Sequence, residues 1–334
     1  MNKASKISVA MCTCNGETYL QEQLESILVQ TMPPDELIVC DDASTDRTVG
    51  ILNTFKRQCN FPVTLIVNKN RVGVCKNFEN AIAHCSGDII VLSDQDDIWL
   101  PFKIATLMAT FESDPRCGYV FSNAALIDER GGYLGRDLWT SLGFDKARQS
   151  KYFSGDQLNV MLKCFSFVYG MTMAFRGALK AKLLPFECRF PRVIVHDGWI
   201  SLMLTAIGSH GIAIPSCLVK YRQHDKQLAS AGKPLVFRDL LMKKRSTTIQ
   251  VNLTLADSLL SLSERLQQLD PLNKHVLRAR RQLTEKAMHL RARAHANSSR
   301  GYQRFKTVLI EAISGRYGRY SRSFQSVVKD LISS

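Results

Sequence analysis

The first hundred residues of the chain alternate short apolar runs with longer stretches in which apolar residues recur at helical spacing. The apolar runs are bounded by polar residues, as buried strands are, and they span residues 7–11, 36–40, 63–67 and 89–92. The helical stretches span residues 17–31 and 46–58 and a segment through Asn77 and His84. Strict alternation of strand and helix predicts an α/β fold, with a mostly parallel sheet flanked by helices on both faces.

Polar residues follow each of these four runs. In open parallel sheets, ligands bind outside the carboxyl ends of the strands, and those ends share one edge. The polar segments are residues 12–15, 41–42, 68–73 and 94–97. We therefore expect their side chains to converge on a single edge of the sheet.

The pattern is less regular from residue 101 to residue 232. It predicts a helix, a strand, a hairpin turn and an extended segment, over residues 103–111, 118–122, 131–132 and 169–175 respectively.

No Asp, Glu, Lys or Arg occurs between Asp197 and Lys220. A membrane-spanning helix needs about 20 mostly apolar residues, but glycines at 208 and 211 and Pro215 interrupt this stretch. We expect a buried helix over 199–207 and a strand over 212–219 rather than a membrane span.

Beyond residue 233 the apolar spacing is helical and strand signals are few. The predicted helices cover residues 240–269, 272–297, 307–313 and 324–332. We therefore expect an α/β domain over residues 1–232 and a helical region over residues 233–334.

The basic residues are concentrated in this helical region. The chain holds 44 Lys and Arg against 30 Asp and Glu, and residues 233–334 alone hold 20 against 7. Basic amphipathic helices bind anionic membrane surfaces, basic faces also attract nucleic acids, and the same pattern is compatible with the solvated face of a packed subdomain. We favour a membrane surface, and expect no nucleic-acid partner because no nucleic-acid-binding motif occurs.

The cysteines and the N-terminus bear on location. All ten cysteines lie between Cys12 and Cys217, many inside apolar runs, and no CxxC pair occurs. Buried free thiols in a reducing compartment are therefore favoured over disulfides. Residues 1–6 lead into no long apolar core of the kind that a secretory signal has. We expect a cytoplasmic protein that sits peripherally on the inner face of the cell membrane.

The densest candidate chemistry is the segment Ser93 to Asp97, which directly follows the fourth strand. Three of its residues, Asp94, Asp96 and Asp97, are carboxylates. Crowded carboxylates repel one another unless a cation or hydrogen bonds compensate. Mg²⁺ and Mn²⁺ are commonly held by one or two carboxylates together with substrate phosphates. The segment is therefore a candidate metal site, and a plain acidic loop is the alternative.

With the segment Asp41 to Thr48, the chain resembles the family 2 glycosyltransferases, which have the nucleotide-sugar-binding fold called GT-A. The resemblance covers about residues 6–225. Its motifs are residues 9–15, 30–31, 41–48, 70–77, 87–99 with Pro101 and Lys103, 170–175 and 196–199. The run from Ser93 to Trp99 is similar to bacterial members described as rhamnosyltransferase-like. The resemblance implies a nucleotide-sugar donor, Mg²⁺ or Mn²⁺, and inverting transfer to a hydroxyl.

The resemblance also implies residues that bind the donor. Asp42 is expected to accept a hydrogen bond from the pyrimidine base, and Asp94 to lie at the ribose or beside the metal ligands. Arg222 is a candidate for the phosphates. The remaining donor-binding residues that it implies are Thr13, Asn15, Asn70, Gly73 and Asn77. For residues 70–73 a plain turn is the alternative.

Metal and base residues are implied in the same way. Asp96 is the expected metal ligand, and His224 can complete the metal site or lie on the surface. Asp197 is the expected general base, although it could also cap the helix that follows. His196 stands where the family usually has an acidic residue, and is expected to orient Asp197.

Gly170, Met171 and Trp199 are expected to line the acceptor pocket. For the segment from Gly170 to Met173, an apolar core strand is the alternative interpretation.

The function implied is transfer of one sugar from a dTDP-, UDP- or GDP-linked donor to a glycan or a polyprenyl-pyrophosphate-linked oligosaccharide. The product would belong to a bacterial surface polysaccharide such as O-antigen or capsule, and rhamnose is one candidate sugar. One alternative is a nucleotide-sugar-binding scaffold without activity. Another is a nucleotidyltransferase, which usually carries a Gly-rich phosphate loop early in the chain, and residues 12–16 match that poorly.

Overall fold

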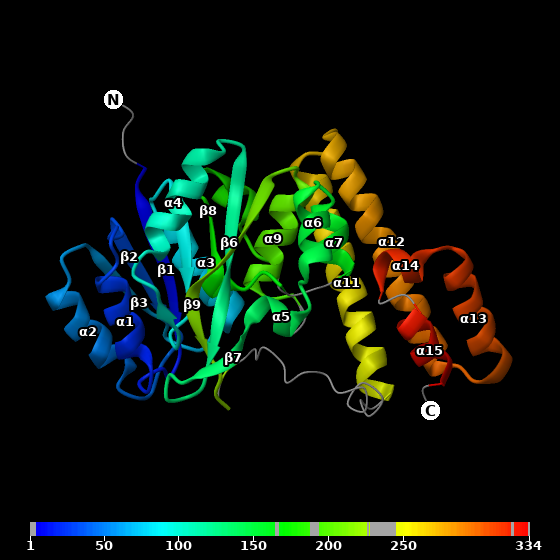
Figure 1. Ribbon diagram of the computed structural model, residues 1–334, viewed down its shortest axis with the longest axis horizontal. Coiled ribbons are helices and arrows are strands. Elements are labelled where there is room, and N and C mark those ends of the chain that lie inside the picture. The colour runs from blue at the N-terminus through cyan, green and yellow to red at the C-terminus, as the bar shows by residue number, and fades with distance from the viewer. Residues whose placement is uncertain are drawn as a thin grey trace.

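The computed structural model of the chain describes residues 5–163, 167–187, 194–225, 227, 245–321 and 324–332. In this described part, one sheet of nine strands has the order β3-β2-β1-β4-β8-β6-β9-β5, with β7 paired to β6. Figure 1 shows the sheet between α2 at one end of the long axis and α13 at the other.

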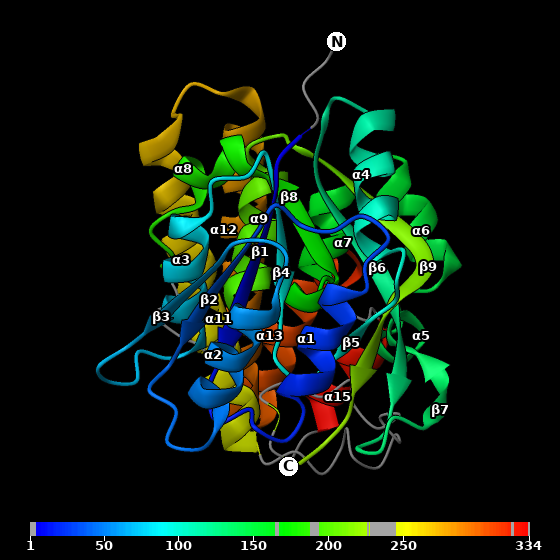
Figure 2. The same cartoon turned by 90° about the vertical axis from the view of Figure 1, so that its left-hand side faces the viewer.

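The first half of the sheet is parallel, as predicted. Strands β1 (Ile7–Thr13), β2 (Glu36–Asp41), β3 (Val63–Val67) and β4 (Ile89–Ser93) pair in parallel. The helices that connect them are α1 (Leu20–Leu28), α2 (Thr48–Gln58) and α3 (Val74–His84). Every residue of β1 and β4 is buried, and Figure 2 shows β3, β2, β1 and β4 following one another in that order across the sheet. Burial on both faces explains why β1 and β4 are almost continuously apolar.

The second half of the sheet mixes parallel and antiparallel pairs, and the sheet as a whole is mostly parallel, as predicted. Strand β8 (Met173–Arg176) lies antiparallel between β4 and β6 (Cys117–Ile127). Strand β9 (His210–Arg222) is parallel to β6 and antiparallel to the two-residue strand β5 (Ile98–Trp99). The long strand β9 therefore carries residues from the far edge of the sheet toward the acidic loop after β4.

The hairpin predicted at residues 131–132 is present, and it joins β6 to β7 (Tyr133–Asp137). Helices α4 (Lys103–Ser113) and α9 (His196–Ala206) also match predicted helices. Four short helices, α5 (Leu138–Leu142), α6 (Lys146–Phe153), α7 (Gln157–Lys163) and α8 (Lys180–Leu183), are not predicted from the sequence.

Five helices make up the described C-terminal part: α11 (Arg245–Leu269), α12 (Lys274–Ser298), α13 (Gly301–Ile313), α14 (Arg316–Tyr320) and α15 (Phe324–Ile332). Leucines of α11 and α12 lie in the same hydrophobic core as the sheet. The boundary expected at residue 232 lies outside the described residues. None of the helices described is both long and apolar enough to cross a membrane.

Candidate functional site

The ends of β1, β2 and β4 meet as the sequence predicts. Thr13 lies opposite Asp41 in the β1–β2 register, and its Oγ1 donates to Asp41 Oδ2 over 2.7 Å. Gln95, in the acidic loop after β4, makes two hydrogen bonds to the loop after β1. Its Oε1 accepts from the amide of Cys14 at 2.8 Å, and its Nε2 donates to the Cys14 carbonyl at 3.2 Å. The polar segments of three strands are thus tied together at one edge.

Asn15 joins the loops after β1 and β2. Its backbone has a positive φ of 50°, and its amide donates to Ser44 Oγ at 2.8 Å. Its side-chain Oδ1 accepts from the amide of Thr45 at 2.8 Å. Thr13 and Asn15 therefore shape the two loops at the place where the donor is expected.

Asp42 is buried and anchors the loop of residues 68–73. Its carboxylate accepts from the amides of Val72 at 2.7 Å and Gly73 at 2.9 Å, and from Asn68 Nδ2 at 3.1 Å. These bonds occupy three of the about four acceptor positions of the carboxylate. Asn68 is a site residue that the sequence argument misses.

Asn77 is also buried, and it braces the same loop. Its Nδ2 donates to the Cys40 carbonyl at 2.7 Å, and its Oδ1 accepts from Asn68 at 2.9 Å. Asn70 and Gly73 are exposed, and Gly73 has φ 85° and ψ 160°, a region that is essentially open to glycine alone. Asn77 thus supports the loop from its buried side, whereas Asn70 and Gly73 are exposed to solvent.

Arg71 is a second residue of this loop that the sequence argument misses. Burial raises the pKa of the Cys14 thiol, and the positive charge of Arg71 opposes that rise. The charge of Arg71 therefore acts on the loop after β1. An exposed arginine there is a candidate for the phosphates of a donor.

The carboxylates of the acidic loop share one electrostatic environment with Asp197. Burial, together with the charges of Asp96 and Asp197, raises the pKa of Asp94 to about 8, and the charge of Lys103 opposes the rise. Residues about a hundred positions apart are therefore neighbours. A cation beside these groups would favour their charged forms.

Asp96 and His224 face each other. Asp96 Oδ2 lies 2.9 Å from His224 Nε2, and the ring of Tyr19 packs against the His224 ring at 4.9 Å between centroids. Within the described residues, no three His, Cys, Asp or Glu side chains gather closely enough to hold a metal ion. Mg²⁺ and Mn²⁺ sites usually use one or two carboxylates and complete their shell with substrate oxygens and water. The pair fits that kind of site and does not form an all-protein cage.

Arg222 holds the acidic loop in place. Its Nε donates to the Asp96 carbonyl at 3.0 Å and its Nη1 to the Glu129 carbonyl at 2.9 Å, while its Nη2 pairs with the Glu22 carboxylate. Its amide donates to Asp97 Oδ1 at 3.1 Å. The family resemblance implies that Arg222 contacts the phosphates. In the structure the guanidinium is buried and already holds three acceptors, so its evident role is positioning.

Lys103 is a buried counter-charge for the acidic loop. Its Nζ donates to the Met171 carbonyl at 2.6 Å and lies 3.5 Å from the centre of the Trp99 ring. Burial lowers the pKa of Lys103, and the charges of Asp97 and Asp94 oppose that change. Asp97 is itself buried, and its Oδ2 has no hydrogen-bond partner.

Asp197 lies in the first turn of α9, where two amides fix its carboxylate. Oδ2 accepts from Gly170 at 3.0 Å and Oδ1 from Gly198 at 2.6 Å. Burial raises the pKa of Tyr169 to about 12, and the charge of Asp197 contributes to that rise. A carboxylate has about four acceptor positions, so these bonds leave it free to accept a further proton donor.

His196 makes no hydrogen bond to Asp197. Its buried ring stacks on Phe78 with 3.8 Å between ring centroids, and neither ring nitrogen has a partner. Burial lowers the pKa of His196, which favours the neutral ring. A Cβ on Gly170 would lie 2.5 Å from His196 Nε2, so glycine at 170 leaves room for the ring.

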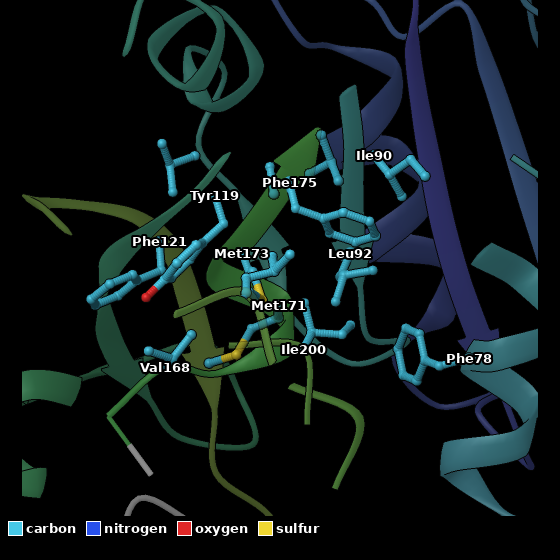
Figure 3. Close-up of a cluster of buried hydrophobic side chains, with 14 of the residues drawn as sticks. Phe78, Ile90, Leu92, Tyr119, Phe121, Val168, Met171, Met173, Phe175 and Ile200 are labelled. Atoms are coloured by element: carbon cyan, nitrogen blue, oxygen red, sulfur yellow. The ribbon is translucent and has the colours of Figure 1, made fainter. Parts of the chain in front are cut away.

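Met171 and Trp199 lie in the core. Figure 3 shows Met171 among the apolar side chains of β4, β6 and β8, and its side chain is fully buried. Trp199 is buried as well, and its Nε1 donates to the Leu183 carbonyl at 3.1 Å. Met171 therefore follows the alternative of an apolar core, Trp199 is buried in the core as well, and Gly170 hydrogen-bonds to Asp197 through its amide.

Residues 8–181 match the family profile of Glycosyl transferase family 2. EpsE of Bacillus subtilis, a protein named as a glycosyltransferase, is 34% identical over 131 residues, which are 39% of this chain and 47% of EpsE. RfbG of Shigella flexneri, named a dTDP-rhamnosyl transferase, is 37% identical over 98 residues, which are 28% of this chain and 34% of RfbG. The chain thus spans about half the length of the first relative and less of the second.

Among solved structures, the chain resembles TarS of S. aureus. TarS residues 1–349 align with a TM-score of 0.58 at 15% identity, over 97% of this chain and 88% of that chain. TarS in complex with UDP-GlcNAc aligns with a TM-score of 0.55, over 94% of this chain and 93% of that chain. At such low identity the likeness bears on the fold alone, and it confirms the expected GT-A fold.

Proposed function

Because the chain belongs to glycosyl transferase family 2, we propose that it transfers a sugar from a nucleotide-sugar donor to an acceptor hydroxyl, with inversion at the anomeric carbon. The observation that carries the proposal is the grouping of Asp94, Asp96 and Asp197 at the carboxyl edge of the sheet, where burial and the charges of Asp96 and Asp197 raise the pKa of Asp94. Carboxylates grouped in this way can hold a cation that binds the diphosphate, and one of them can act as a general base.

The donor would lie across the loops after β1, β2 and β3. Asp42, Asn70, Gly73 and the missed Arg71 belong to this region. UDP-GlcNAc is the ligand of the TarS complex, and the name of RfbG points to dTDP-rhamnose. We therefore propose a dTDP-, UDP- or GDP-linked sugar, with dTDP-rhamnose as one candidate.

Asp96 and His224 are the residues that would hold Mg²⁺ or Mn²⁺, with Asp94 beside them. A bound divalent cation supplies charge neutralisation for the departing nucleoside diphosphate. Arg222 fixes the backbone of Asp96 through its carbonyl, so the acidic loop is held before the donor arrives. Such preorganisation is where enzymes obtain much of their electrostatic catalysis.

Asp197 would act as the general base. It accepts the proton of the acceptor hydroxyl as that oxygen attacks the anomeric carbon, and the bond from this carbon to the diphosphate breaks. Gly170 and Gly198 hold the carboxylate in a fixed orientation through their amides. General-base catalysis of this kind typically contributes about 10²–10⁴ in rate.

The acceptor would be a glycan or a polyprenyl-pyrophosphate-linked oligosaccharide in the synthesis of a bacterial surface polysaccharide. A lipid-linked acceptor requires the enzyme to work at the inner face of the cell membrane, and the basic C-terminal region is suited to that. Several of its cations form ion pairs within the region, including Arg291 with Asp257 at 2.8 Å and Arg319 with Glu285 at 2.9 Å. Only part of the region can therefore face lipid.

The proposal is tested by thermal shift of the purified protein with dTDP-, UDP- and GDP-linked sugars, each with and without Mn²⁺. We expect one nucleotide class to raise the melting temperature, with a larger shift in Mn²⁺, and the same donor to release its nucleoside diphosphate when acceptor is added. No stabilisation by any donor would contradict it. Pyrophosphate release from a nucleoside triphosphate and a sugar phosphate would instead identify a nucleotidyltransferase.

A further inference from the structure

Helix α13 buries Glu311 against the protein and exposes most of its apolar residues to solvent. On the inner side, Glu311 is buried and pairs with His289 at 2.7 Å and Arg316 at 3.0 Å, and Val308 packs beside Tyr317. A helix that covers a core normally has the opposite arrangement. Contacts within the described part of the chain therefore do not account for the exposed apolar residues of α13.

The outer side of α13 is a continuous apolar stripe. At 3.6 residues per turn its members fall within an arc of about 140°, and each has between 44% and 78% of its surface exposed. They are Tyr302, Phe305, Leu309, Ile310 and Ile313. Isolated exposed apolar residues are common, but a contiguous stripe marks an interaction surface.

The surroundings of the stripe are positively charged. Arg300, at the N-cap of α13, and Lys306, which falls within the same arc as the stripe, are both exposed. From residue 286 to the end of the sequence, the only acidic residues are Glu311 and Asp330. Both are buried, and Asp330 is paired with Arg293 at 2.6 Å. The exposed surface of this segment thus combines apolar and basic groups without a carboxylate.

We propose that the outer face of α13 docks on an anionic lipid bilayer, with the helix lying in the headgroup plane. The proposal deepens the membrane association proposed above, on which it rests, by naming the surface that makes the contact. Tyr302 supplies an amphipathic anchor and Phe305 an apolar one, and Arg300 and Lys306 supply attraction to anionic headgroups. Figure 1 places α13 at the end of the long axis, beyond α12, where a flat surface can reach it.

The positive charge around α13 favours a lipid bilayer over the other partners that could cover an apolar face. A second copy docked through the same face would bring like charges together, because a two-fold interface pairs a patch with itself. A nucleic acid would match the cations but would leave the apolar stripe uncovered. An anionic bilayer satisfies both the stripe and the cations.

Flotation of the full-length protein with phosphatidylcholine vesicles, with and without phosphatidylglycerol, tests the proposal. We expect the parent protein to float with the anionic vesicles only. The double variant Phe305→Ser, Leu309→Ser should lose at least about tenfold in partitioning. The double variant Arg300→Gln, Lys306→Gln should lose roughly fivefold per cation.

Matched controls lie elsewhere on the surface. Tyr133→Ser with Leu134→Ser removes exposed apolar residues from β7, and Lys56→Gln with Arg57→Gln removes exposed cations from α2, at the other end of the molecule. Both controls should float as the parent does.

The proposal is overturned if the parent does not float, or if both α13 variants float as well as the controls. It is also overturned if light scattering finds a dimer that Phe305→Ser, Leu309→Ser converts to monomer. All variants alter exposed positions, and an unchanged melting temperature establishes that they fold. Flotation needs no donor, so its failure leaves the sugar-transfer proposal to be judged by the thermal-shift assay.

Discussion

Arg222 is buried at the end of β9, and the guanidinium holds the carbonyls of Asp96 and Glu129 and the carboxylate of Glu22. Removing one partner of a buried charged network leaves the others unpaired, which typically costs about 3–5 kcal/mol. We predict that Arg222→Ala lowers the free energy of unfolding by about 3 kcal/mol in urea titrations.

Glu22→Gln is the control, because the Glu22 side chain is 57% exposed and can be solvated when its charge is lost. We expect its effect on the free energy of unfolding to stay below about 1 kcal/mol. An Arg222→Ala protein as stable as Glu22→Gln would contradict the positioning role.

Two buried histidines should make stability depend on pH. Burial lowers the pKa of both His196 and His289 below the ordinary value of about 6.5. Below that pH the two histidines bind protons in the unfolded chain but stay neutral in the folded chain. The free energy of unfolding is therefore highest above about pH 6.5. It falls as the pH drops, by up to about 1.4 kcal/mol per pH unit for each histidine.

Urea unfolding measured at several pH values between about 5 and 7.5 checks this dependence. His196→Asn should make the slope shallower. His84→Asn, at an exposed position on α3, should leave the slope as it is. Equal slopes for the parent and His196→Asn would count against a neutral, buried His196.

At the scale of elements, the loop of residues 68–73 depends on the backbone of Gly73. Its φ of 85° disfavours any other residue, yet a Cβ there would meet no atom within 4 Å. Gly73→Ala should therefore cost about 1–3 kcal/mol through backbone strain alone, and should weaken donor binding because the loop is held by Asp42.

Gly50 provides the matched control, because it lies in α2 and a Cβ there also meets nothing within 4 Å. Gly50→Ala should stabilise the protein by about 0.5–1 kcal/mol, since alanine is the better helix former. Thermal unfolding of both variants checks the difference in sign. Stabilisation by both substitutions would contradict the assigned loop conformation.

The sequence predicts β1 to β4 and the helices between them because their signal is local periodicity. It does not predict the antiparallel placement of β8 or the two-residue strand β5, because both are fixed by pairing with residues far along the chain. Helices α5 and α6 have local signals that were available: Asp137 and Asp145 cap them through side-chain hydrogen bonds.

In the site, the sequence brings Asp42, Asp94 and Asp96 to one edge because strand order and loop position determine it. The neighbourhood of Asp197 came only from family resemblance. Whether a side chain is free or already bonded could not be predicted, since Arg222 and Asn77 are satisfied by partners that only the fold brings near.

At the scale of the whole molecule, helices α11 and α12 share the core of the sheet. Leu262 of α11 is fully buried in that core, whereas Leu272, between the helices, is 89% exposed. Leu262→Ala should lower the free energy of unfolding by about 2–5 kcal/mol, and Leu272→Ala should have little effect.

Calorimetry distinguishes a shared core from two independent domains. We expect a single unfolding transition that Leu262→Ala shifts as a whole. Two transitions, only one of which moves, would mean that the C-terminal helices fold separately from the sheet.

The most direct test of the proposed chemistry is the rate of sugar transfer by Asp197→Asn, measured beside its donor affinity in Mn²⁺. The asparagine keeps an oxygen that can accept a hydrogen bond from Gly170, but it cannot take a proton from the acceptor. We predict a loss of about 10²–10⁴ in transfer rate with donor affinity within about twofold of the parent. Transfer at near the parent rate would contradict the assignment of Asp197 as the general base.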